Sequence, residues 1–162
     1  MKKIVLLFLL MVNISVYAEI HPNKLFHISK SSNRNIVCYE AMLKGNALNI
    51  TDPVHPFWIN NEDKQGEETE LNLIQKKLAY GYKAIKSTAT EAEITLKAYN
   101  KRSIKIRQQA GKWRAYILIN GKESLLNEIY VKSKEGNSMI VEYIILKGSL
   151  NGASVQEKVV NK

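Results

Sequence analysis

The second half of the chain alternates apolar and polar residues in short segments that turn residues separate. Ile94, Leu96 and Ala98 alternate with polar neighbours, which is typical of a half-buried strand. Asn120 and Gly121 separate two such segments, and this dipeptide favours a tight hairpin because both central residues of a type I′ turn take positive φ. The pattern predicts six successive antiparallel strands, over 93–98, 104–107, 113–119, 125–132, 139–147 and 155–160.

One of these segments does not alternate. From 139 to 146 the residues are apolar on both faces except at Glu142, and a strand buried on both sides needs a cover on its second face. The segment 69–80 is the best candidate for that cover.

This cover is predicted to be an amphipathic helix. Leu71, Ile74 and Leu78 recur at the spacing of one helical stripe. Thr69 is placed to cap its start, and Gly81 is placed to end it in the left-handed conformation. We therefore expect a helix at about 69–80, packed on the sheet.

The first third of the chain is less regular but also favours strands. Segments 24–29 and 35–43 flank a polar loop, and 57–59 can pair after Pro56. The fold class is therefore mainly β: an antiparallel meander that forms a barrel-like sheet or a sandwich, with one helix. Closure would remove edge strands and can leave a ligand cavity, and the pattern leaves both architectures open.

The N-terminus has the three parts of a secretory signal. Lys2 and Lys3 precede the apolar run 4–12, and Val16 and Ala18 supply small residues at the cleavage site. The run is shorter than the roughly 20 residues that span a bilayer. These features predict a signal peptide at 1–18, one domain at 19–162, no membrane span, and a periplasmic or secreted protein.

The chain is basic, with a formal net charge of +9 over 162 residues. Such a charge aids solubility or attracts anionic partners. The lysines are scattered apart from a cluster at 97–107, and the tyrosines are not interleaved with a basic stripe, so nucleic-acid binding is not expected.

No catalytic motif, phosphate loop, dinucleotide fingerprint or calcium loop is present. The single cysteine, Cys38, lies in a β-branched and aromatic run and is best interpreted as a buried thiol. A thiol enzyme would need His27 or His55 beside it. The three histidines, which include His21, lack metal-ligand spacing. We therefore expect neither an enzyme nor a cofactor or metal.

Several aromatic and amide side chains flank the predicted helix. They can line a pocket mouth, or Trp58 and Tyr80 can simply hold the helix to the sheet.

The first hypothesis is an exported, non-enzymatic envelope protein that binds a small apolar or amphipathic ligand beside the predicted helix. Alternatives are a protein–protein interaction or scaffold module of the periplasm, and a thiol enzyme using Cys38; the oligomeric state is left open. An open cavity of about 300 Å³ or more beside the helix would favour the ligand, and a sealed contact would favour the scaffold. The candidate ligand-binding residues are Trp58, Asn60, Gln75, Tyr80 and Tyr82.

Three stretches carry a resemblance to a known family. Residues 33–39, 53–59 and above all 70–81 resemble the exported bacterial family catalogued as domain of unknown function 4833. The resemblance extends over roughly residues 24 to 160. It implies a single domain, and it implies no substrate, cofactor or catalytic residue.

Overall fold

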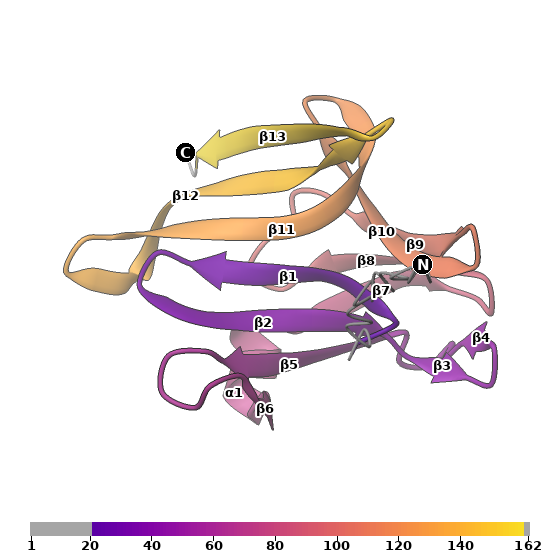
Figure 1. Cartoon of the computed structure of the whole chain (residues 1–162), viewed down its shortest axis with the longest axis horizontal. Helices are drawn as coiled ribbons and strands as arrows, with labels where there is room; N and C mark the ends of the chain where they lie inside the picture. The colour runs from indigo at the N-terminus through magenta and orange to yellow at the C-terminus, as the bar shows by residue number, and fades with distance from the viewer. Residues whose placement is uncertain (1–20, 161–162) are drawn as a thin grey trace, which may run out of the picture.

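The computed structural model describes residues 21–160. The predicted signal peptide lies outside these residues. The described part consists mainly of strands with one short helix (Figure 1). The elements are β1 (Lys24–Lys30), β2 (Asn33–Ala41), β3 (Leu43–Lys44), β4 (Ala47–Leu48), β5 (Val54–Asn60), β6 (Glu67–Glu70), α1 (Leu73–Leu78), β7 (Tyr82–Ser87), β8 (Glu91–Leu96), β9 (Ile104–Gln109), β10 (Lys112–Ile119), β11 (Lys122–Lys134), β12 (Asn137–Leu150) and β13 (Ala153–Val160).

Within residues 21–160, eleven strands form one sheet and β3 and β4 form a separate small hairpin. The path runs β6-β5-β2-β1-β11-β10-β9-β8-β7, with β12 paired to β11 and β13 paired to β12. The sheet curls into a half-barrel (Figure 1). The prediction of a mainly β protein with one helix is confirmed, and the sheet takes the barrel-like form. Across the described part of the chain, no helix is both apolar and long enough to cross a bilayer.

The sheet branches at β11. β10 pairs with the first part of this strand, where Tyr116 lies opposite Leu125. β1 pairs with the later part in parallel, where His27 lies opposite Glu128. β12 occupies the other edge from Leu125 to Lys134. Two branches, β1-β2-β5-β6 and β10-β9-β8-β7, therefore leave the same edge of one strand.

The predicted meander is confirmed. From β8 to β13 each strand pairs antiparallel with the next. Asn120 and Gly121 have φ values of 51° and 75°, as a type I′ turn requires. Ala110 also adopts a positive φ, 49°, although its Cβ disfavours this region.

The core fills the concave side of the curled sheet and draws on both branches. Phe26 and Tyr39 stack there with ring centroids 4.4 Å apart, and both are fully buried, as is Ile106 of the other branch. The strands that surround it alternate as predicted: β8 has a strictly alternating burial pattern with Ala92, Ile94 and Leu96 inward.

The helix differs from its prediction in length and in contacts. Residues 67–70 form β6, which pairs with β5, so the chain is extended where the first helical turn was expected. Leu71 follows this strand and enters the core, whereas Ile74 and Leu78 are each 70% exposed. The predicted stripe is therefore wrong, because only two of its three members lie on the helix and these face outward.

The helix ends are set by residues other than those predicted. Asn72 caps the start and forms a capping box with Gln75, in which each side chain bonds the other residue's backbone N–H. Gly81 does not have a positive φ. It is required because an added Cβ would lie 1.8 Å from the Lys76 carbonyl oxygen.

Among residues 21–160, no element covers the first residues of strand β12. Met139 is 91% exposed and Ile140 is 47% exposed, whereas Ile144 and Leu146 enter the core. The prediction that a helix shields the second face of this strand is therefore wrong. The apolar residues at 139 and 140 remain accessible near the tip of the β11–β12 hairpin.

An ion pair ties β13 to the rest of the sheet. The Arg102 guanidinium donates to both carboxylate oxygens of Glu157, at 2.8 and 2.6 Å, and also to the Leu118 carbonyl oxygen at 2.7 Å. The backbone N–H of Asn120 donates to the same carboxylate. These contacts, led by Arg102, lower the pKa of Glu157 to about 2.

The positive φ at Ala110 gives a first prediction. Ala110→Asn should raise the free energy of unfolding by about 0.5–1 kcal/mol, because asparagine tolerates the left-handed region better than alanine does. Urea unfolding at neutral pH measures the change. Ala84→Asn, the same substitution in an exposed position of β7, should give no gain. A loss of stability in Ala110→Asn would contradict this account of the turn.

The Glu157 ion pair gives a second prediction. Its pKa is depressed in the folded state, so its stabilisation is fully present above the ordinary value of 4.5 and is lost as the pH falls toward about 2. Glu157→Gln should therefore be less stable than the wild type by roughly 1–2 kcal/mol at neutral pH. This gap should close between these two pH values.

Unfolding curves of the two proteins at several pH values measure the gap. Glu135→Gln, in the exposed turn between β11 and β12, is the matched control and should differ little from the wild type. A gap for Glu157→Gln that stayed constant down to the lower pH would show that the carboxylate charge is not responsible.

Candidate functional site

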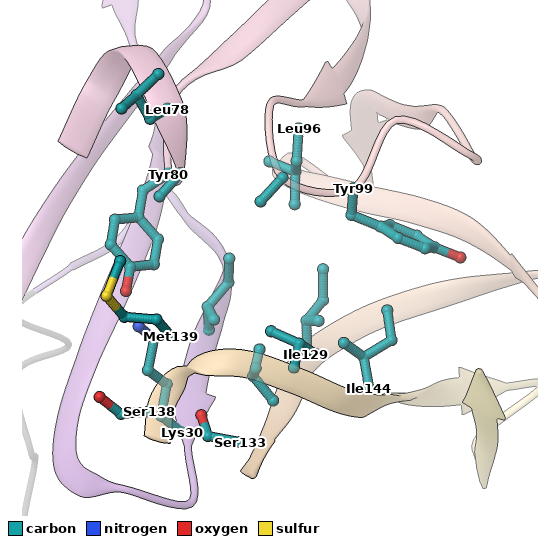
Figure 2. A pocket seen from close by; sticks show the side chains of 15 residues that line it. Lys30, Leu78, Tyr80, Leu96, Tyr99, Ile129, Ser133, Ser138, Met139 and Ile144 are labelled. Carbon is teal, nitrogen blue, oxygen red and sulfur yellow. The ribbon is translucent and has the colours of Figure 1, made fainter. Parts of the chain in front are cut away.

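A cavity of about 470 Å³ lies between the two branches of the sheet. Five parts of the chain form its walls: β1, β11, β12, the segment at the end of α1, and the end of β8 with the loop after it (Figure 2). The lining is mostly apolar. Its residues are Ile28, Lys30, Leu78, Ala79, Tyr80, Leu96, Ala98, Tyr99, Ile129, Val131, Ser133, Ser138, Met139, Val141 and Ile144.

Two of the lining side chains are apolar and largely exposed. Leu78 is 70% exposed and Met139 is 91% exposed, and they lie on either side of Tyr80 in Figure 2. Ile129 and Ile144, by contrast, are buried. The cavity therefore has a buried apolar floor and an accessible apolar rim.

Tyr80 is held in place from behind the cavity. The Tyr39 hydroxyl donates to the Tyr80 carbonyl oxygen at 2.7 Å, and burial raises the pKa of Tyr39. The Trp58 ring meets the Tyr80 ring edge-on at 5.1 Å, and its indole N–H donates to Gln75 Oε1 at 3.3 Å. Because the same oxygen accepts from the Asn72 N–H, one amide links Trp58 to the helix cap.

The five residues predicted for a ligand site therefore have different positions. Tyr80 lines the cavity, and Trp58 and Gln75 support it, as expected if these side chains hold the helix to the sheet. Asn60 donates to the Glu67 carbonyl oxygen and to Thr69 Oγ1 within the β5–β6 hairpin. Tyr82 lies outside the cavity lining, and its hydroxyl donates to Asp52 Oδ1.

The polar residues of the cavity were not among those predicted. Lys30 extends from the end of β1, with Nζ 5.0 Å from the Tyr80 ring centroid. Ser133 is 4% exposed, and its Oγ has no hydrogen-bond partner among the described residues. Lys30 could have been identified from the sequence, because side chains two residues apart in a strand lie on the same face. Lys30 therefore lies on the same face of β1 as the buried residues Phe26 and Ile28.

Cys38 and His27 lie opposite each other in the pairing of β1 with β2. Neither lines the cavity. Cys38 is fully buried, and that burial raises its pKa to about 11. Burial also lowers the pKa of His27. A protonated thiol beside a neutral imidazole lacks the thiolate character of a nucleophilic pair.

The other two histidines bind carboxylates near the β5–β6 edge. His21 lies between Glu40 and Glu68, at 2.7 and 2.9 Å, and His55 Nε2 is 2.6 Å from Glu70. Among residues 21–160, no three histidine, cysteine or acidic side chains are grouped so as to hold a metal ion.

The basic cluster at 97–107 is largely paired within the molecule. Arg107 Nη2 lies 2.6 Å from Glu123, Lys105 Nζ lies 3.4 Å from the same residue, and Arg102 pairs with Glu157. Much of this positive charge is therefore offset by carboxylates on neighbouring strands.

These features define a class of protein: a half-barrel of antiparallel strands, branched at one long strand, with an apolar cavity between its branches. The family model described as Domain of unknown function (DUF4833) matches residues 26–159, and the chain belongs to this family. No curated protein and no solved structure matches the chain. The family match confirms the resemblance to domain of unknown function 4833 that the sequence carries.

The burial of Cys38 gives a third prediction. At about pH 8 the folded protein should not react with a disulfide reagent such as DTNB, because the thiol is both inaccessible and protonated. One thiol should react after denaturation, since the chain has one cysteine. Glutathione in the same buffer is the positive control. Rapid reaction of the native protein would restore the thiol-enzyme hypothesis.

Proposed function

We propose that this chain is an exported, non-enzymatic envelope protein that binds a small amphipathic ligand, with the apolar part of the ligand in the cavity between the two sheet branches. The observation that carries the proposal is the open apolar cavity of about 470 Å³. This volume lies in the range of about 300–1,000 Å³ that small-molecule sites occupy.

The exposed rim supports the same proposal. Leu78 and Met139 expose apolar surface beside the cavity, and the neighbouring helix residues Leu73 and Ile74 are 85% and 70% exposed. Exposed apolar side chains that gather beside a cavity are a feature of ligand-binding surfaces. An alkyl chain in the cavity would remove part of it from water.

A neutral fluorescent probe, N-phenyl-1-naphthylamine, tests the proposal. Its emission should rise on binding to the wild-type protein. Val141→Phe, which fills the cavity from β12, should weaken binding at least about tenfold. The matched control is Ile145→Phe, on the same strand but outside the lining, which should bind as the wild type does.

Thermal unfolding of both variants shows whether they remain folded. The proposal fails if the wild type binds neither this probe nor laurate. It also fails if Val141→Phe, still folded, binds the probe as well as Ile145→Phe does.

A further inference from the structure

Most polar side chains of the cavity gather at one end, whereas Tyr99 lies at the opposite side with its hydroxyl directed away from them. In Figure 2 the Lys30, Ser133 and Ser138 side chains lie together at one side, and the Tyr80 hydroxyl points toward them. Leu78, Leu96 and the ring of Tyr99 lie on the other side of the space. The cavity is therefore amphipathic along its length.

Lys30 is the only charged residue among those that line this cavity. No carboxylate of residues 21–160 forms an ion pair with it, whereas Lys147, Lys105 and Lys86 are each paired with a glutamate. Its ammonium faces the Tyr80 ring instead. A cation in a mostly apolar site gains most from an anion that is desolvated with it.

Ser133 supplies a second, independent indication. Ser133 is almost fully buried, and its Oγ makes no hydrogen bond within the described part of the chain. Its backbone N–H is already bonded to Ser31 Oγ, at 3.0 Å. A buried hydroxyl without a hydrogen-bond partner is unfavourable, and an acceptor oxygen from a ligand would supply that partner.

We infer that the ligand is an anionic amphiphile whose carboxylate or phosphate oxygens bind Lys30 Nζ and the Ser133 hydroxyl, with its alkyl chain against Leu96, Ile129 and Ile144. This inference rests on the proposed function and adds the chemistry of the head group. An ammonium and hydroxyl groups supply donors to an oxyanion, and the lining contains no acidic side chain.

The test compares amphiphiles of one chain length as competitors of the neutral probe, each below its micelle concentration. Laurate and dodecyl phosphate should displace the probe from the wild type at concentrations at least about tenfold lower than dodecanol or dodecyltrimethylammonium require. The two anions separate a carboxylate site from a phosphate site, and either preference supports the inference.

Lys30→Met keeps the alkyl stem and removes the charge. It should abolish the preference for anions, so that laurate and dodecanol displace the probe from this variant at similar concentrations. Lys30→Gln serves as a second variant if the first does not fold. Lys132→Met, on β11 but outside the cavity lining, is the matched control and should keep the preference.

Two results would overturn the inference. If dodecanol competes as well as laurate against the wild type, or if Lys30→Met retains the preference, the head group does not bind Lys30, and only this inference falls. If neither the probe nor any amphiphile binds, the proposed function falls and the inference falls with it.

Discussion

The architecture depends on the way in which one edge of β11 is divided between two partners. β10 takes the first part of that edge and β1 takes the later part. The change coincides with a register shift between Leu126 and Glu128, and such a bulge bends and twists a strand. Gly148 of β12 lies opposite Leu126. A Cβ at Gly148 would lie 1.9 Å from the Leu125 carbonyl oxygen. The bend separates the two branches, and the cavity lies between them.

The far edges of the branches are joined by the segment that contains α1. Backbone hydrogen bonds fix its end to the loop after β8: Lys97 N–H donates to the Gly81 carbonyl oxygen at 2.9 Å, and Ala98 N–H donates to that of Ala79 at 3.3 Å. Tyr39 holds the Tyr80 carbonyl from the other branch. The helix thus connects the two sides of the half-barrel instead of covering a sheet face. This role explains why a helix can be well capped and still leave its apolar residues in water.

The hairpins from β8 to β13 were predictable because their signals are local. Alternation sets the faces, and a dipeptide such as Asn120–Gly121 sets the turn. The parallel pairing of β1 with β11 was not predictable, since no local pattern identifies a partner so distant in the chain. The helix was predicted too long because Leu71 fits both a strand continuing from Thr69 and a helical stripe. Of the residues predicted for a ligand site, only Tyr80 lines the cavity. Lys30 and Ser133 were missed because the long-range pairing of β1 with β11 brings them together. The alternation along β1 did indicate that the Lys30 side chain lies on the same face as Phe26 and Ile28.

The pairing of β1 with β11 also constrains the order in which the strands fold. Ser29 and Glu128, which share a hydrogen bond, are 99 positions apart, and contacts of such separation form late because loop closure must precede them. The branch that begins at the N-terminal strand cannot join the sheet until the chain has been made beyond residue 128. A chain truncated before β11 would lose the anchor of its first strands as well as its last three strands. The N-terminal branch is thus first in sequence but depends on the C-terminal part of the chain for its place in the fold.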